Sequence, residues 1–122
     1  MKLAIIGSRD FNDYPLLVDS INSLVEESIT MIVSGGAKGA DSLGEKYANE
    51  NNIPIKIFKP DWKKHGRAAG FIRNVDIVKE SDTVIAFWDG KSRGTENSIN
   101  HARKMDKGLL IVHYNEEQSN VF

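Results

Sequence analysis

Residues 30–41, TMIVSGGAKGAD, are the stretch of sequence that most directly predicts the fold. A short β-branched apolar run is followed by three glycines within five positions, and a segment of helical composition begins at Gly39. A buried strand that passes through a glycine-rich loop into a helix exposes backbone N–H groups at the positive end of that helix, which is a typical anion-binding arrangement. The loop is not a Walker A motif, because Ala40 and Asp41 follow Gly39, and it is not the dinucleotide motif G-x-G-x-x-G either.

Strand and helix patterns alternate outward from this stretch along the whole chain. Apolar runs typical of buried parallel strands cover residues 3–6, 30–33, 53–58, 83–87 and 109–112. Helices are expected from about 15 to 28, 39 to 51, 66 to 80 and 95 to 107. The alternation predicts an α/β fold, a single Rossmann-like domain over residues 1–114 with a five-stranded parallel sheet and helices on both faces. Residues 115–122 are expected to form a polar tail.

Apolar spacing and end signals predict how these helices are placed. Pro15 suits a first turn, Thr95 stands at the N-cap of the last helix, and Gly108 stands where its C-cap would lie. The side chains expected to face the core are Leu17, Ile21, Leu24, Val25, Phe71, Val75, Val78, Ile99, Ala102 and Met105.

Composition narrows the possible partners. The 122 residues include 16 Lys and Arg against 17 Asp and Glu, and the resulting net charge of -1 disfavours nucleic acid or an anionic membrane as partner. There is no cysteine, and His65, His101 and His113 lack metal-ligand spacing, so neither a metal site nor a cofactor is expected. Without a signal peptide or an apolar run of membrane-spanning length, a cytoplasmic protein is expected.

The first two strand-to-helix loops carry residues that suit phosphate or sugar. The loop GSRDFND, at 7–13, offers the hydroxyl of Ser8 and the planar guanidinium of Arg9, but a turn in which Asp10 or Asp13 caps the helix explains it equally well. In the second loop, Lys38 could contact phosphate, while Asp41 could accept hydrogen bonds from ribose hydroxyls or cap the helix.

The two later regions also leave alternatives open. The segment KPDWKKHGRAAGFIRN, at 59–74, could stack a base on Trp62, although a solvated loop is favoured for most of its cations. Arg73 and Asn74 would point toward the ligand if Phe71 faced the core. The loop FWDGKSRGTEN, at 87–97, could add a second helix N-terminus to clamp one phosphate, or could be a plain turn followed by a cap.

No catalytic residue is predicted from these loops. The residues expected to bind a ligand are Gly7, Ser8, Arg9, Phe11, Ser34, Gly35, Gly36, Ala37, Lys38, Gly39, Asp41, Arg73, Asn74, Asp89, Gly90, Ser92, Gly94, Thr95 and Glu96.

In combination, the motifs GSRxF, SGGAxGxD, W…G…AG…RN and FWDGxSxGT resemble those of the YspA-like branch of the SLOG superfamily, over about residues 1–112. The wider group includes the nucleotide-binding domain of the DNA-processing protein Smf and the LONELY GUY phosphoribohydrolases. The resemblance implies a Rossmann-like fold that binds nucleotides or nucleotide-derived molecules, commonly as a homo-oligomer. It also implies a connection to nucleotide signalling and phage conflict.

The resemblance to LONELY GUY enzymes is only partial at the catalytic motifs. Those enzymes are implied to use an Arg and the Glu of P-G-G-x-G-T-x-x-E to cleave the N-glycosidic bond of a nucleoside 5′-monophosphate. Arg73 matches the Arg approximately and Gly94-Thr95 match the second motif, but Ser98 stands at the Glu position.

The sequence and the resemblance suggest three possible functions. The leading hypothesis is a sensor or sequestering protein for an ADP-ribose or cyclic-nucleotide type of signal. The alternative is a phosphoribohydrolase-like enzyme in which Asp41, Asp89 or Glu96 supplies the missing carboxylate. A DNA-binding accessory domain, by analogy with Smf, is disfavoured by the neutral charge.

Overall fold

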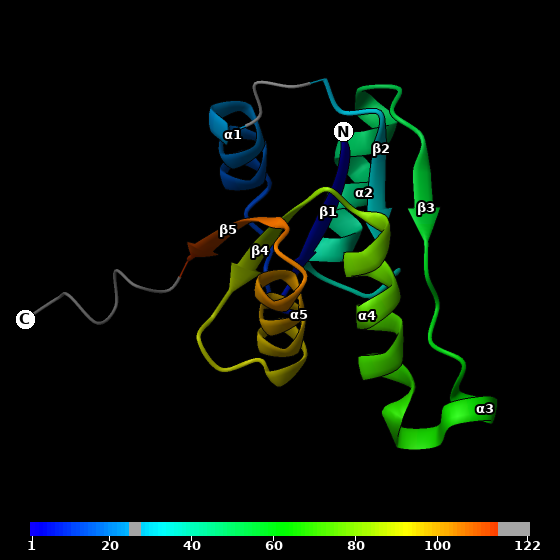
Figure 1. Ribbon diagram of the computed structural model, residues 1–122. Helices are drawn as coiled ribbons and strands as arrows, with labels where there is room; N and C mark the ends of the chain where they lie inside the picture. The colour runs from blue at the N-terminus through cyan, green and yellow to red at the C-terminus, as the bar shows by residue number, and fades with distance from the viewer. Residues whose placement is uncertain (25–27, 115–122) are drawn as a thin grey trace, which may run out of the picture.

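Residues 1–24 and 28–114, which the computed structural model describes, form a central sheet with helices on both faces (Figure 1). The strands are β1 (Lys2–Gly7), β2 (Met31–Ser34), β3 (Ile55–Ile57), β4 (Thr83–Trp88) and β5 (Gly108–His113). The helices are α1 (Tyr14–Leu24), α2 (Ala40–Glu50), α3 (Trp62–His65), α4 (Ala69–Glu80) and α5 (Arg93–Lys104), with a short 3₁₀ helix, η1, at Gly66–Ala68. The expected tail 115–122 and the expected core residue Val25 lie outside the described residues.

The order of the strands places a switch point at the centre of the sheet. The order is β3-β2-β1-β4-β5, and every neighbouring pair is parallel. From β1 the chain proceeds outward to β2 and β3, then returns to form β4 on the other side of β1. Successive connections diverge between β1 and β4, which is where open α/β sheets bind ligands. The predicted α/β fold with a five-stranded parallel sheet is confirmed.

Alternate residues of the central strands pack into two separate cores. Leu3 and Ile5 of β1 face α1 and α2, whereas Ala4 and Ile6 face α4 and α5. Successive side chains of a strand point to opposite faces, so a strand buried on both sides needs a continuous apolar run. The runs in β1 and β4 meet this requirement, and the helices cover both faces as predicted (Figure 1).

The two edge strands are less buried than the sequence predicts. The expected strand 53–58 is reduced to β3, in which Lys56 and Ile57 are exposed. The N–H of Ile53 donates to the carbonyl of Ala48 at 2.9 Å and so closes the end of α2 instead of joining the sheet. At the other edge, the inner residues of β5 are only partly buried.

The expected helix 66–80 is divided into η1 and α4, and a short helix that was not expected, α3, precedes it. Asp61 caps α3 by accepting a hydrogen bond from the N–H of Lys64 at 3.1 Å, and Gly66 turns the chain with a φ of 56°. The prediction that Phe71 faces the core is wrong, because its side chain is 46% exposed. The buried side of α4 includes the polar Asn74 together with Ile77. Because a polar residue lies on this side, the buried face of α4 differs from the apolar stripe that the sequence predicted.

Both ends of α5 differ from the prediction. The helix begins at Arg93, and the side chain of Ser92 caps it by accepting from the N–H of Thr95 at 3.4 Å, so Thr95 is not the N-cap. At the other end Asp106, not Gly108, adopts a left-handed φ of 56°. Gly108 opens β5 instead, where a side chain would meet the hydroxyl of Thr83.

Candidate functional site

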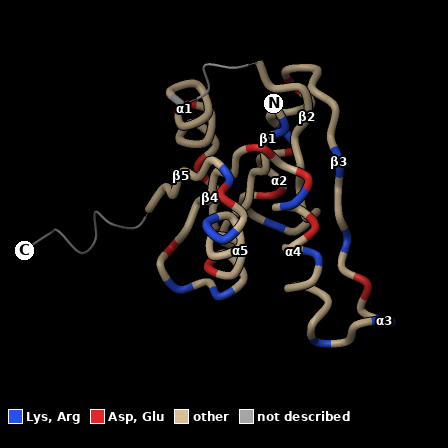
Figure 2. The backbone as a smooth tube through the Cα atoms, viewed as in Figure 1, with Lys and Arg blue, Asp and Glu red and all other residues tan. Residues whose placement is uncertain are grey.

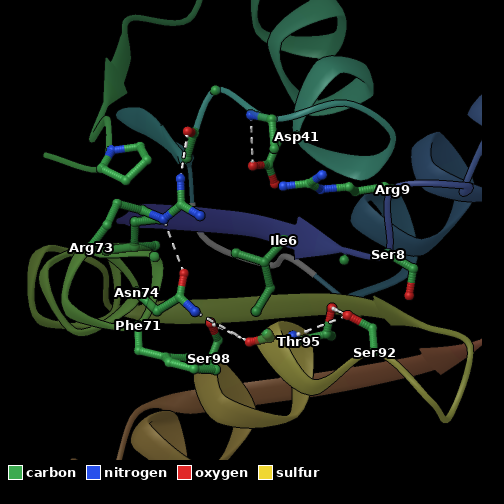
Figure 3. A pocket seen from close by; sticks show the side chains of 18 of the residues that line it. Ile6, Ser8, Arg9, Asp41, Phe71, Arg73, Asn74, Ser92, Thr95 and Ser98 are labelled. Carbon is green, nitrogen blue, oxygen red and sulfur yellow. Dashed lines mark hydrogen bonds between the residues drawn. The ribbon is translucent and has the colours of Figure 1, made fainter. Parts of the chain in front are cut away.

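A cavity of about 690 Å³ opens at the carboxyl ends of β1, β2 and β4, beside the switch point of the sheet (Figure 3). Its volume lies within the range of small-molecule sites. The loops after all three strands line it, and α4 supplies a further wall that carries Arg73 and Asn74. The elements that the sequence marked for ligand binding are therefore brought together around one space.

The first loop contributes Gly7, Ser8 and Arg9 to the cavity. The Ser8 hydroxyl accepts a hydrogen bond from the N–H of Asp89 at 3.3 Å, which ties this loop to the one after β4. The side chain of Arg9 is exposed and extends along the cavity (Figure 3). A guanidinium in this position is available to an anionic ligand.

The rest of the first loop has a structural role. Asp13 caps α1 by accepting from the N–H of Leu16 at 3.1 Å, as the turn interpretation of this loop predicted. Phe11 is buried and stacks on Phe87 with ring centroids 4.5 Å apart, so it belongs to the core and does not line the cavity. Asp10, which was expected at most to cap the helix, lines the cavity.

The second loop lines the cavity with Gly35, Gly36, Ala37 and Asp41. Two of its backbone N–H groups are engaged by the chain itself. The N–H of Ala37 donates to the Asp41 carboxylate at 3.1 Å, and that of Gly36 donates to the Ser34 hydroxyl at 3.2 Å. The position expected for an external anion at these two groups is thus taken by side chains of the loop.

Asp41 is a buried carboxylate on the wall of the cavity, with only 7% of its surface exposed. Burial raises its pKa to about 6, although the Ala37 N–H and the charge of Arg73 act in the opposite direction. Gly35 lies between the two charged groups, since a Cβ there would come 2.9 Å from Asp41 Oδ2 and 2.7 Å from Arg73 Nη1. Any larger residue at this position would displace both side chains.

Arg73 and Asn74 connect the second loop to α5 (Figure 3). Arg73 donates from Nη1 to the Gly35 carbonyl at 2.8 Å and from Nε to Asn74 Oδ1 at 3.0 Å. Asn74 in turn donates to the carbonyl of Gly94 at 3.3 Å. Partial burial lowers the pKa of Arg73, the charge of Asp41 raises it, and the charge of Arg9 lowers it further. The guanidinium groups of Arg9 and Arg73 are therefore close enough to influence each other, and both line the cavity.

The loop after β4 begins with the turn that the structural alternative predicted. Asp89 Oδ1 accepts hydrogen bonds from the N–H groups of Lys91 and Ser92, each at 2.8 Å, and Gly90 has a φ of 81°. Burial raises the pKa of Asp89, but these hydrogen bonds and one with Ser8 outweigh burial and hold the pKa below its ordinary value. The Asp89 carboxylate therefore stabilises the turn after β4.

The first turn of α5 presents hydroxyls and backbone N–H groups to the cavity. Ser92, Gly94 and Thr95 line it, and the hydroxyls of Ser92 and Thr95 lie 3.1 Å apart. Within the described residues, the N–H group of Gly94, which lines the cavity, has no hydrogen-bond acceptor. A Cβ on Gly94 would have no atom within 4 Å, so there is open space beside it. The free N–H of Gly94 and the two hydroxyls, at the positive end of α5, suit an oxyanion.

Some expected ligand-binding residues lie outside the cavity lining. They are either buried beneath the loops or exposed away from the cavity: Phe11, Ser34, Lys38, Gly39, Gly90 and Glu96. Gly39 serves close packing, because its φ is 78° and a Cβ would come 2.4 Å from the Ser8 carbonyl oxygen.

Several lining residues were not among those expected to bind a ligand. Ile6 of β1 lies in the middle of the cavity, and Ser98 of α5 lines it while donating to the Gly94 carbonyl at 3.3 Å (Figure 3). The other side is lined by Trp62, Arg67 and Phe71, from α3 to α4. The tryptophan among the lysines and arginines was the sequence signal for this wall.

No helix within residues 1–24 and 28–114 is long and apolar enough to cross a membrane. The same residues contain no group of three or more His, Asp or Glu side chains placed to hold a metal ion.

The fold is that of a Rossmann-like α/β domain with a cavity at the switch point of its sheet. The chain belongs to the YspA, cpYpsA-related SLOG family, YAcAr, whose sequence profile matches residues 1–65. It is also similar to the Gene 61 protein of Mycobacterium phage D29, with 28% identity over an alignment of 124 residues that covers 95% of this chain and 98% of that protein. The family match confirms the resemblance to the YspA-like branch of the SLOG superfamily.

Proposed function

We propose that the protein binds a nucleotide or nucleotide-derived signal, of the ADP-ribose or cyclic-nucleotide type, as a sensor or sequestering protein. The observation that carries the proposal is the meeting of three strand-to-helix loops around one cavity at the switch point of the sheet. Membership of a SLOG family adds to this observation, since that superfamily is associated with nucleotides. The homo-oligomeric state and the cytoplasmic location expected from the sequence remain predictions.

The first turn of α5 is the best position for the phosphate of such a ligand. The free N–H group of Gly94 and the hydroxyls of Ser92 and Thr95 supply donors there. Arg9 brings a positive charge from the first loop. Figure 2 shows further Lys and Arg residues on α3 and on the loop before α5, at the same end of the molecule. The cavity lining itself balances its cations with carboxylates, three arginines against three aspartates: Arg9, Arg67, Arg73, Asp10, Asp41 and Asp89. The phosphate would therefore be held by the donors of α5 and by Arg9 and not by a general positive field.

Calorimetry with AMP, ADP-ribose and a cyclic dinucleotide tests the proposal. We expect at least one of them to bind, and we expect Arg9→Ala to weaken binding about tenfold or more, because a charge-assisted hydrogen bond contributes roughly 1.5 to 3 kcal/mol. Lys38→Ala is the matched control, since it removes an exposed cation from the neighbouring loop outside the cavity. Absence of binding by all three compounds, or equal losses in the two variants, would contradict the proposal.

A phosphoribohydrolase-like enzyme is the second candidate, and Asp41 is the observation that favours it. Of the three carboxylates considered, Glu96 is exposed outside the cavity lining and Asp89 is held by its own loop. Asp41 lines the cavity beside Arg73, and a pKa near 6 suits proton transfer at neutral pH. Release of free adenine from AMP, abolished in Asp41→Asn, would support this activity, and intact AMP after long incubation would refute it.

A further inference from the structure

The exposed apolar side chains of the described chain are concentrated in one short segment. They are Ile57, Trp62, Phe71 and Ile72, all between the end of β3 and the second turn of α4. Two of them line the cavity, namely Trp62, which is 58% exposed, and Phe71, which is 46% exposed. Large aromatic side chains on the wall of a polar cavity are a place where an apolar part of a ligand can be buried.

Local structure holds the indole of Trp62 against the start of α4. The short helix α3 begins at the cap formed by Asp61, and the positive φ of Gly66 turns the chain back toward α4. A Cβ on Gly70 would lie 3.8 Å from Cη2 of Trp62, so the indole rests on the first turn of α4 where no side chain intervenes. Pro60, Gly70 and Phe71 line the cavity beside it. The indole is thus positioned by the backbone while most of its surface stays accessible.

The cavity has chemically different ends. Phe71 lies at one end, on α4, whereas Ser8 and Ser92 lie at the other, with Ile6 between them (Figure 3). The polar end also holds the free N–H group of Gly94 at the start of α5. A ligand that fits both ends has an oxyanion at one extremity and a planar apolar group at the other, as a nucleoside 5′-phosphate does.

We propose that Trp62 and Phe71 form a base-stacking subsite, so that the ligand is a nucleotide whose base, preferably a purine, lies against α3 and α4 while its phosphate lies at α5. This inference rests on the proposed function and adds the orientation of the ligand and the recognition of its base. Every base has a π-face that stacks on an aromatic side chain, and a purine offers the larger one. Arg67, which lines the same wall, places a cation next to the stacked base.

The test compares AMP with ribose 5-phosphate, which keeps the sugar and phosphate but lacks the base. Calorimetry on the wild-type chain should show AMP binding about tenfold more tightly than ribose 5-phosphate. Trp62→Ala should bring AMP down to the affinity of ribose 5-phosphate and leave ribose 5-phosphate unchanged, while Trp62→Phe should retain most of the preference. Because Trp62 is mostly exposed, the alanine variant should fold, and its circular dichroism spectrum would verify this.

Ile72→Ala is the matched control. It removes an exposed apolar side chain next to Phe71 that does not line the cavity, and it should change neither affinity. Equal wild-type affinities for the two compounds, or equal weakening of both by Trp62→Ala, would overturn the base subsite and leave the phosphate site standing. Failure of both compounds to bind would overturn the proposed function together with this inference.

Sedimentation velocity separates the subsite from a contact between copies of the chain. We expect the same sedimentation coefficient for the wild type and for Trp62→Ala. If the variant dissociated an oligomer and kept the tenfold preference for AMP, Trp62 would belong to a protein interface and the inference would be wrong.

Discussion

Replacing Asp41 with asparagine should stabilise the protein at neutral pH. The carboxylate is buried, and its pKa is raised from the ordinary value of 3.8 to about 6. Between these two pH values the folded state binds more protons at this site than the unfolded chain does, so the stability of the wild type falls as pH rises from about 4 to about 6. Above that range the full cost of holding a buried charge is present. Asparagine keeps the shape and the acceptor for the Ala37 N–H but carries no charge.

The size of the expected stabilisation follows from the shift in the pKa of Asp41. About two pKa units correspond to about 3 kcal/mol, because each unit is worth about 1.4 kcal/mol. The attraction of Arg73 is already included, since it opposes the shift that burial produces. Asp41→Asn should therefore be about 3 kcal/mol more stable than the wild type at pH 7.5. The difference should fall below about 1 kcal/mol at pH 4 and approach zero only below about pH 3, where the carboxyl is protonated in both the folded and the unfolded state.

Urea unfolding of both proteins between pH 4 and pH 8 measures this difference. Contributions of other groups to acid unfolding cancel when the two proteins are compared at each pH. Asp19→Asn, at an exposed position on α1, is the control and should show a difference within about 0.5 kcal/mol at every pH. A variant that is less stable than the wild type at pH 7.5, or a difference that does not grow with pH, would refute the reasoning. A stabilised variant that lost ligand affinity would show that the charge is kept for binding.

Three other substitutions test the roles assigned to single residues. Gly39→Ala should lower the free energy of unfolding by about 2 kcal/mol or more, because φ at this position is 78° and the new Cβ would collide with the Ser8 carbonyl. An unchanged free energy of unfolding in urea would contradict this packing. Gly94→Ala should unfold at an equal or slightly higher urea concentration, because no atom lies within 4 Å of the added Cβ. The same variant should weaken AMP binding about tenfold in calorimetry. Unchanged affinity would mean that the phosphate binds elsewhere. Ser92→Ala should cost about 1 kcal/mol through loss of the α5 cap, and a midpoint equal to that of the wild type would show that the cap is dispensable.

The central sheet could be predicted from the sequence because its strands are buried on both faces. The runs that form β1 and β4 are apolar at consecutive positions, and a signal of this kind depends little on distant residues. Edge strands lack that signal, so β3 is shorter than expected. The inner face of α4 was misassigned because Asn74 takes a buried position through hydrogen bonds to Arg73 and Gly94, which residue type alone does not indicate.

The location of the cavity could also be predicted, whereas the contacts within it could not. Polar loops after parallel strands gather at one edge of the sheet, which brings the loops of Ser8, Gly35 and Ser92 together. The engagement of the Ala37 N–H by Asp41 depends on the conformation of the folded loop. The approach of Trp62 to the cavity depends on the turn at Gly66 and the absence of a side chain at Gly70, which are tertiary features.

The most direct test of ligand binding at the switch point is a titration of the ¹⁵N-labelled protein with AMP, followed in ¹⁵N–¹H correlation spectra. The account predicts the largest shifts for the amide of Gly94, which lines the cavity, together with shifts of the Trp62 indole N–H. Amides of the edge strand β5 should stay in place. Shifts confined to surfaces away from the cavity, or none at millimolar AMP, would contradict it.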